Sequence, residues 1–430
     1  MPSPDPIVVG RAVDARTEFA AALFDAAREA SRDVEGVTRP AWSERDMAAA
    51  RQVETAAQEL GLETSWDPAG NLLATLPGAD RNARQVLTGS HVDSVPRGGN
   101  YDGHAGVLAS LTALAAFRDL GWTPPCDITA IAMHGEESVW FGTAYLGSKL
   151  ACGTLPDGDL DRLRRADTSQ TLAECIAGCG FDVDALRAAK PWIDASNTRA
   201  FLELHIEQGP LLIDADQPVA IPTAIRGNVR FPDARCLGRY DHSAACPRAW
   251  RQDTALATAE LISRLEAWWI EQEKAGVPNT VFTVGKLFTD PAEHAMTKVP
   301  GRMDFTLNFG GTTNGFLEAS AARIAELASE IAARRDVRFE LGGRVGSRPT
   351  PLDPGLRAAL IAAAEAQGMQ PQEFATVGHD TSVFAGVGIP GAMVLVRNTN
   401  GSHNPHEAMA IEDFMAGTRT MAAAIAAVAG

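Results

Sequence analysis

Short apolar runs that are followed within a few residues by a histidine or a carboxylate recur along this chain, and they constrain its fold more than any other feature. The runs VLTGS, ITAIAM, FLEL and AMVLV are bounded by glycine, proline or polar residues, which is typical of buried strands. Carboxyl ends of strands meet at one edge of an open α/β sheet, so the polar residues that follow them are expected to gather there. Those residues are His91, Glu136, Glu137, His205 and His403.

Helical patterns alternate with these runs. Residues 106–120 have helical periodicity and lie between strands predicted at 86–90 and 127–133, which is the strand–helix–strand order of an α/β sheet. The other helices predicted for the same sheet cover residues 14–32, 43–61, 355–367 and 412–429, and its other strands cover 71–76 and 392–396.

The chain of 430 residues is long for one core and predicts two domains. After Pro210 its character changes to strands over 218–240 and 279–310 with helices at 252–274 and 315–334. We therefore expect an α/β protein with a discontinuous catalytic domain, residues 1–216 and 336–430, and an inserted α+β domain at 217–335.

The charge balance excludes some partners. Acidic residues outnumber basic ones by 54 to 38, and no basic run is present that could neutralise phosphates, so we expect neither a nucleic acid nor an anionic membrane as partner. The N-terminus does not have the pattern of a signal peptide, and no apolar run approaches the length needed to span a bilayer. The six cysteines are scattered, which favours reduced thiols and a cytoplasmic location.

Imidazoles combined with carboxylates favour zinc, manganese, cobalt or nickel over calcium and magnesium. A single histidine after a strand is more often a capping or surface group than a ligand, but the joint pattern at several strand ends favours a metal site. The Glu136-Glu137 pair fits a solvated surface poorly, because it follows an apolar strand and precedes Trp140. His104 and His134 stay open at this point.

The motifs GSHVDS, GGNYDG, EESVWFG, ELHIEQGP, VGHD and RNTNGSHNPHEAM, read in order from residue 89 to 409, extend this pattern. In residues and order they resemble the hydantoinase/carbamoylase branch of the M20 metallopeptidase family, which includes N-carbamoyl-L-amino acid hydrolases, β-ureidopropionases and allantoate amidohydrolases. ELHIEQGP is the most specific of these motifs.

The resemblance implies two divalent metal ions (Zn, Mn, Co or Ni) that share Asp102. His91 and His205 are the other implied ligands of one ion, and Glu137 and His403 are the other implied ligands of the second ion. Asp93 orients the imidazole of His91, a common need of metal-bound histidine. Glu136 is the implied general base, which takes a proton from the attacking water and returns it to the leaving nitrogen.

The resemblance also assigns residues outside the metal ligands. It makes the inserted domain a lid through which the protein forms a homodimer, with His242 reaching a partner's site to stabilise the oxyanion. Here the sequence departs from many relatives, because Ala-Ala-Cys follows soon after His242. Gln208, Gly378 and Arg397 are the implied substrate contacts.

Two positions of the resemblance do not match. Relatives hold the substrate carboxylate with a lid asparagine and a lid arginine, and these positions fall on Thr297 and Gly310, with Asn308 where an aspartate is usual. Glycine cannot replace a bidentate guanidinium. The resemblance therefore implies intact hydrolytic residues with an altered carboxylate clamp, and Arg226, Arg239 and Arg302 stay open as substitutes.

Three functions follow in order of preference. The first is hydrolysis of a small N-carbamoyl or ureido compound, with atypical specificity. The second is cleavage of an ordinary amide on the same scaffold, such as an N-acyl amino acid, an amino-acid conjugate or a dipeptide. The third is a binding protein without catalysis, which the lost clamp favours and the complete set of ligand residues disfavours. The substrate, the metal and the stereochemical preference stay open.

Overall fold

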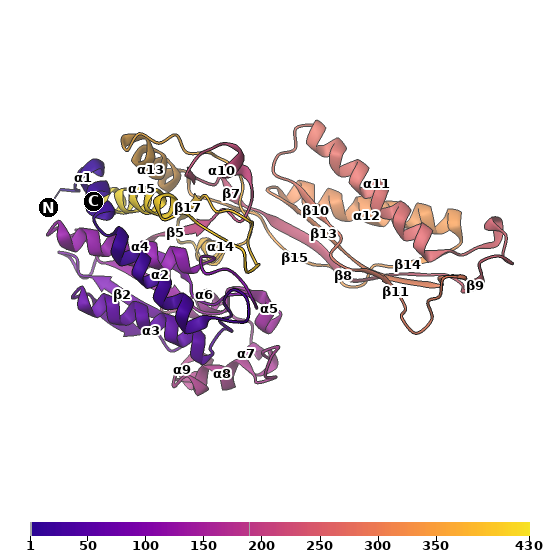
Figure 1. The fold of residues 1–430 in the computed structure, drawn as a ribbon, viewed down its shortest axis with the longest axis horizontal. Coiled ribbons are helices and arrows are strands. Elements are labelled where there is room, and N and C mark those ends of the chain that lie inside the picture. Colours follow the sequence, from indigo (N-terminus) through magenta and orange to yellow (C-terminus); the bar gives the residue numbers. More distant parts are fainter. Residues whose placement is uncertain (1, 189) are drawn as a thin grey trace. The chain divides into compact units, whose positions relative to one another are not determined.

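The computed structural model describes residues 2–188 and 190–430, which form two compact units (Figure 1). The discontinuous unit contains the chain up to Thr223 and from Leu352 onward, and the inserted unit is Ala224–Pro351. Both boundaries lie further along the chain than the predicted 217 and 335.

Strand pairing explains the shifted boundaries. β6 (Val219–Ala220) pairs with β17 (Gly391–Val396) and so belongs to the discontinuous unit. β14 (Arg338–Glu340) and β15 (Val345–Ser347) both pair with β8 (Gly227–Leu237) of the inserted unit. Such pairings join residues far apart in sequence, so they could not be assigned from local periodicity.

The discontinuous unit is built on a seven-stranded sheet with the order β1-β2-β4-β3-β5-β17-β6. The four central strands β4, β3, β5 and β17 run parallel to one another. β2 is antiparallel to β4, β6 is antiparallel to β17, and β1 is antiparallel to β2. The four parallel strands therefore present their carboxyl ends at one edge. The bounds are β1 Glu63–Trp66, β2 Leu72–Leu76, β3 Gln85–His91, β4 Ile128–Met133 and β5 Thr198–Ile206.

Helices cover both faces of this sheet, which is why its central strands are apolar throughout. Val86 packs into the larger core, whereas the next residue, Leu87, packs into a smaller core on the other side, as strand alternation requires. The larger core includes α4 (His104–Asp119), whose residues from His104 to Phe117 are all buried. The other long helices are α1 Pro6–Asp14, α2 Thr17–Ser31, α3 Glu44–Glu59, α13 Pro354–Ala366 and α15 Ile411–Ala429.

The local signals account for most of these elements. Ser43 caps α3 by accepting a hydrogen bond from the backbone N–H of Asp46, as predicted. The segment 155–200, which has helical tendency in the sequence, contains three short helices and the first residues of β5, and residue 189 within it lies outside the described residues. The short helices are α5 Ser138–Phe141, α6 Leu146–Ala151, α7 Asp159–Arg162, α8 Leu172–Gly178, α9 Val183–Arg187, α10 Leu211–Asp214 and α14 Thr381–Gly386.

The inserted unit is an α+β arrangement. β13 (Arg302–Gly311) lies at the centre of its six-stranded sheet between β8 and β10 (Val281–Thr283), and also pairs with β11 (Leu287–Thr289). The long helices α11 (Thr254–Lys274) and α12 (Asn314–Arg335) pack on one face of this sheet (Figure 1). Smaller elements are β7 Ala224–Ile225, β9 Asp241–His242, β12 Lys298–Val299, β16 Thr350–Pro351 and the 3₁₀ turn Arg248–Trp250.

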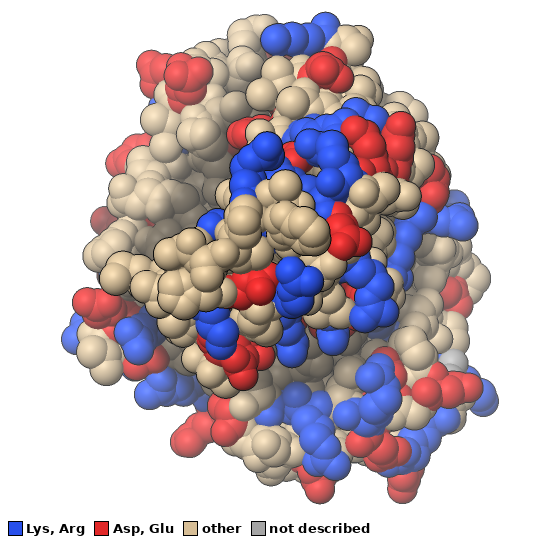
Figure 2. All heavy atoms as spheres, turned by 90° about the vertical axis from the view of Figure 1, so that its right-hand side faces the viewer, with Lys and Arg blue, Asp and Glu red and all other residues tan. Residues whose placement is uncertain are grey.

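Surface charges of both signs lie close together. Figure 2 shows a face on which Lys and Arg side chains are interspersed with Asp and Glu. Within the inserted unit, ion pairs such as Arg264–Glu330 (2.8 Å) join side chains of opposite sign. All six cysteines are free. No helix in the described residues is long and apolar enough to cross a membrane.

Candidate metal centre

The carboxyl edge of the parallel strands carries the polar residues predicted from the sequence. His91 is the last residue of β3, and His205 lies next to the end of β5. Glu137 follows β4 in a short bend, and His403 lies in the loop after β17. Asp102 comes from the loop that leads into α4, so the five side chains are delivered by different segments of the discontinuous unit.

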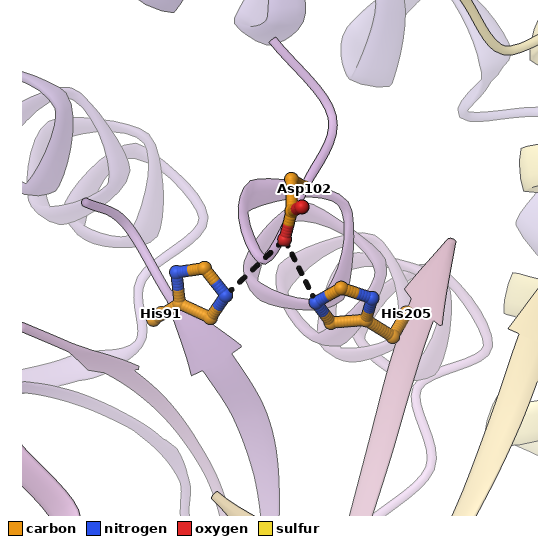
Figure 3. A group of neighbouring side chains, drawn as sticks. All are labelled: His91, Asp102 and His205. Atoms are coloured by element: carbon orange, nitrogen blue, oxygen red, sulfur yellow. Dashed lines mark ion pairs between the residues drawn. The ribbon is translucent and has the colours of Figure 1, made fainter. Parts of the chain in front are cut away.

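These side chains converge in two groups that share one carboxylate. His91, Asp102 and His205 form one group, and Asp102, Glu137 and His403 form the other, with the ligand atoms of each group within 4.8 Å of one another. Oδ1 of Asp102 lies 3.5 Å from Nε2 of His91 and 3.2 Å from Nε2 of His205 (Figure 3). Its other oxygen, Oδ2, lies 3.2 Å from Nε2 of His403.

The imidazoles present lone pairs to this carboxylate. Nδ1 of His91 lies 3.0 Å from the carbonyl oxygen of Asp93, and Nδ1 of His205 lies 3.0 Å from that of Ile206, so each Nδ1 carries a proton. In the neutral ring, Nε2 is then unprotonated, and that of His205 accepts a hydrogen bond from Gly103 N (3.1 Å). Unprotonated nitrogens directed at a buried carboxylate are the arrangement that a bound cation stabilises.

The charges of the second group, Asp102, Glu137 and His403, also favour a bound cation. Hydrogen bonds to Asp102 and Glu137 raise the pKa of His403 to about 11. The two carboxylates therefore stabilise an extra positive charge among these three side chains. Glu137 is itself 6 % exposed, and burying its carboxylate without a cation would be unfavourable. The residues present therefore fit two divalent ions, and the imidazole–carboxylate donor set suits Zn, Mn, Co or Ni.

Asp93 positions the bend that carries the two glutamates. Its Oδ1 accepts a hydrogen bond from Glu136 N and its Oδ2 accepts one from Glu137 N, both at 3.2 Å. The carboxylate lies 3.6 Å from Nδ1 of His91, which is beyond hydrogen-bond distance, and the backbone carbonyl of Asp93 is the nearer acceptor. Asp93 thus orients His91 through its main chain and the glutamates through its side chain.

Glu136 lies beside the ligands but belongs to neither ligand group. Burial raises the pKa of its carboxyl well above the usual range, and the neighbouring Glu137 and Asp380 act in the same direction. A carboxylate with a raised pKa accepts protons more readily than an exposed one. The bend is held in place by Tyr145, whose N–H donates to the carbonyl oxygen of Glu136 (3.1 Å).

The structure adds two residues to the surroundings of Asp102 that the sequence reasoning did not single out. Glu407 accepts hydrogen bonds from the N–H groups of Tyr101 (3.0 Å) and Asp102 (3.2 Å). Ser402 Oγ lies 2.5 Å from Asp102 Oδ2 and 2.6 Å from Glu407 Oε2. Both residues fall in the motif RNTNGSHNPHEAM, from which the sequence analysis took only Arg397 and His403 as site residues.

Three further histidines have structural contacts. His134 places Nδ1 2.7 Å from Asp46 and Nε2 2.8 Å from the carbonyl oxygen of Gly70, so both its nitrogens are engaged away from the ligand groups. His104 is buried at the start of α4 and packs edge-on against Phe24. His379 was not identified as a candidate site residue from the sequence. The centroid of its ring lies 4.4 Å from the ring centroid of His205.

The predicted substrate contacts of the discontinuous unit differ in their surroundings. Nε2 of Gln208 donates to Oδ2 of Asp102 (2.7 Å), which brings Gln208 to the ligand groups. A Cβ at Gly378 would lie 1.9 Å from the hydroxyl of Tyr145, so this position tolerates only glycine without rearrangement. The guanidinium of Arg397 binds Asp413 through two hydrogen bonds of 2.9 Å and also Asp216, so protein carboxylates occupy its donors.

The remaining predicted residues belong to the inserted unit. His242 on β9 pairs with Lys298 on β12, and Ser243 N donates to the carbonyl oxygen of Thr297, so His242 and Thr297 are close neighbours. Gly310 on β13 lies opposite Val281, and a Cβ at Gly310 would lie 2.7 Å from Cγ2 of that valine. The strand is thus packed in a way that leaves little room for an arginine at position 310.

Comparisons with known proteins agree with this fold and motif order. The model of peptidase family M20/M25/M40 matches residues 87–427. Allantoate amidohydrolase of Escherichia coli K12 is 29% identical, with 90% of this chain and 92% of that protein covered. N-carbamoyl-L-amino acid amidohydrolase of Geobacillus stearothermophilus is 32% identical over the same shares. A hydantoinase/carbamoylase family amidase from Burkholderia multivorans superimposes with a TM-score of 0.87 at 25% identity, covering 96% of this chain and 98% of that one. The chain belongs to peptidase family M20/M25/M40.

Proposed function

We propose that this protein is a metal-dependent amidohydrolase that cleaves a C–N bond of a small N-carbamoyl or ureido compound. The observation that carries the proposal is the shared carboxylate: Asp102 directs Oδ1 at two imidazoles and Oδ2 at a third, beside the unligated Glu136. The relatives named above act on allantoate and on N-carbamoyl amino acids, which supports a ureido substrate.

Two divalent ions held by the five ligand residues would lower the pKa of water and polarise the substrate carbonyl. Glu136 accepts the proton of the attacking water, and the water oxygen bonds to the carbamoyl carbon. The C–N bond then breaks, and Glu136 returns the proton to the leaving nitrogen. A substrate R–NH–CO–NH₂ and one water thus give the amine R–NH₂ and carbamic acid. The carbamic acid then breaks its remaining C–N bond and yields carbon dioxide and ammonia.

Gln208 is suited to hold the substrate next to Asp102. Its Nε2 donates a hydrogen bond to Asp102. The other amide atom, Oε1, is a buried acceptor that has no hydrogen-bond partner in the described part of the chain. A buried acceptor of this kind is unfavourable unless a ligand supplies a donor. The N–H groups of a carbamoyl substrate are such donors, and we assign this contact to Gln208.

His242 and the inserted unit complete the proposal. We propose that this unit is a lid, that His242 stabilises the developing oxyanion, and that the protein is a homodimer through the inserted unit. β10 and β11 both pair with β13, and edge strands of such a sheet are open to pairing with a second chain. A mass of one chain for the fully active species in sedimentation analysis would contradict the dimer.

The experiment that tests the proposed function is a screen for ammonia. Protein loaded separately with Zn, Mn, Co or Ni is incubated with ureido acids, N-acyl amino acids and uncharged amides, and both amine and ammonia are measured. We expect equal amounts of amine and ammonia from a carbamoyl compound. Amine without ammonia would identify an ordinary amidase instead, and no release from any of these classes would contradict hydrolysis.

Substrates that lack a free carboxylate should be preferred over N-carbamoyl-α-amino acids. Thr297 and Gly310 cannot supply the asparagine and arginine contacts, and the guanidinium groups of Arg239 and Arg302 bind Asp241 and Asp304. Arg226 is the remaining alternative; its Nε donates to the carbonyl oxygen of Asn279 (2.8 Å). Without a clamp, a buried substrate carboxylate is left unpaired, which weakens transition-state binding.

Steady-state kinetics with an N-carbamoyl amino acid and with its amide test this preference. We expect kcat/KM for the amide to equal or exceed that for the free acid. If the free acid is preferred by about a hundredfold, worth about 2.7 kcal/mol, another cation supplies the clamp. Arg226→Ala would then show whether that cation is Arg226.

A further inference from the structure

Arg39 is the largest charged side chain that is completely buried in the discontinuous unit, and it contacts the loop that follows β3. Its exposed fraction is 0%. Nε donates to the carbonyl oxygen of Val92 (2.7 Å), the residue between His91 and Asp93. The backbone of Arg39 is also fixed to this loop, because its N–H donates to Ser94 Oγ (3.0 Å) and its carbonyl accepts from Ser94 N (3.1 Å).

The same guanidinium contacts the loop that carries Asp102. Nη1 donates to Oδ1 of Asn100 (3.2 Å), two residues before Asp102, and Nδ2 of Asn100 donates to the carbonyl oxygen of Phe24 in α2 (2.8 Å). Nη1 also donates to Ser31 Oγ (3.1 Å) at the end of α2. One side chain therefore joins the His91 loop, the Asp102 loop and a core helix through hydrogen bonds.

The charge of Arg39 is surrounded by carboxylates without touching one. Burial lowers the pKa of the Arg39 guanidinium. The buried carboxylates of Asp46, Asp93, Glu407 and Asp102 act in the opposite direction. Among the described residues, none of the carboxylates comes within the 4.0 Å of an ion pair with Arg39. A guanidinium stays charged in proteins, so this is a permanent positive charge inside an acidic region.

We infer that Arg39 is a positioning residue for the metal centre, which fixes the His91 and Asp102 loops relative to each other and offsets the repulsion among the buried carboxylates. The inference rests on the two-metal site of the proposed function. It predicts weaker binding of both ions, because both share Asp102. The larger effect is expected on the ion that also needs His91, because the Arg39 guanidinium donates to Val92 beside His91 and, among the described residues, to neither of the segments that carry Glu137 and His403. The ion at His91, Asp102 and His205 should therefore depend on Arg39 more than the other.

Lysine should not replace Arg39. The planar guanidinium reaches Val92, Ser31 and Asn100 from two nitrogens in a fixed fork, whereas an ammonium is a single point at the end of a flexible stem. In Arg39→Lys the positive charge is kept but the link between the two loops is lost. Residues that orient ligands in this way change metal affinity by about 10–100-fold when replaced.

The test is a zinc titration of the full-length protein, after chelator treatment, in competition with a chromophoric zinc chelator. Wild-type protein should bind two ions, and Arg39→Lys should bind both more weakly, one of them by about 10–100-fold and the other by a smaller factor. Arg165→Lys is the matched control, because Arg165 is also buried and donates to the backbone of Ala41 and Trp42. The control should bind both ions as wild type does.

Asn100→Ala removes the hydrogen bond between Arg39 and the Asp102 loop and keeps Arg39. This variant tests the inference if Arg39→Lys does not fold. We expect weaker binding of both ions in this variant, because Asp102 belongs to both ligand groups. Affinities for both ions within about threefold of wild type in a folded Arg39→Lys or Asn100→Ala protein would overturn the inference. Wild-type protein that binds no zinc would overturn the proposed two-metal site and this inference together.

Discussion

Glu136→Gln should lose nearly all turnover while keeping the fold and both metal ions. Glutamine has the shape of glutamate but cannot accept and return a proton, and general base catalysis contributes about 10²–10⁴-fold to a rate. The hydrogen bond from Glu136 N to Asp93 uses the backbone and is unaffected by the substitution. The measurement is kcat for the metal-loaded variant on the substrate found in the ammonia screen.

Glu137→Gln is the matched comparison, because the two residues are adjacent and the same atom is changed. It should also lose activity, but through loss of the ion that Glu137 and His403 would hold. Metal content therefore separates the two variants: unchanged in Glu136→Gln and lowered in Glu137→Gln. Turnover of Glu136→Gln within about threefold of wild type would remove Glu136 from the role of base.

Asp102→Asn should have the largest effect on metal content, because both oxygens of Asp102 face imidazoles. Oδ1 lies near Nε2 of His91 and of His205, and Oδ2 lies near Nε2 of His403. An amide offers one oxygen and no negative charge, so at most one ion keeps an oxygen ligand at this position and neither keeps a carboxylate. We expect both ions to be lost or held weakly, with turnover reduced by roughly a thousandfold or more, about 4 kcal/mol in transition-state stabilisation.

A control for this variant is Asp119→Asn, at the end of the same helix that Asp102 precedes. Asp119 is exposed and binds Arg16. Exposed ion pairs contribute at most about 1 kcal/mol to stability, so this variant should keep both metal ions and its activity. Asp102→Asn protein that retains two tightly bound ions would show that Asp102 is not shared between them.

Much of the fold was predictable because its signals are local. The central strands are continuous apolar runs and the helices have caps and periodicity that operate within a few residues, as Ser43 at α3 illustrates. The missed elements lack such signals. β1 (Glu63–Trp66) has exposed and half-buried residues in alternation, and it is a strand because it pairs with β2 at the sheet edge.

The candidate ligands could be predicted for a related reason. His91, Glu137, His205 and His403 each follow an apolar strand, and a parallel sheet brings such positions to one edge. The residues that hold these ligands in place could not be predicted from the sequence. Glu407 reaches the backbone of Tyr101 and Asp102, and Arg39 reaches Val92 and Asn100, across long stretches of sequence. These contacts depend on how loops pack in three dimensions, which local patterns do not encode.

The most direct test of the two-metal account is the metal content of purified protein after loading with zinc and removal of excess ions. The account predicts two zinc ions per chain in wild type, because His91, Asp102 and His205 form one set and Asp102, Glu137 and His403 the other. Asp102→Asn should then hold fewer than one. Wild-type protein that retains one zinc ion or none after loading would contradict the account.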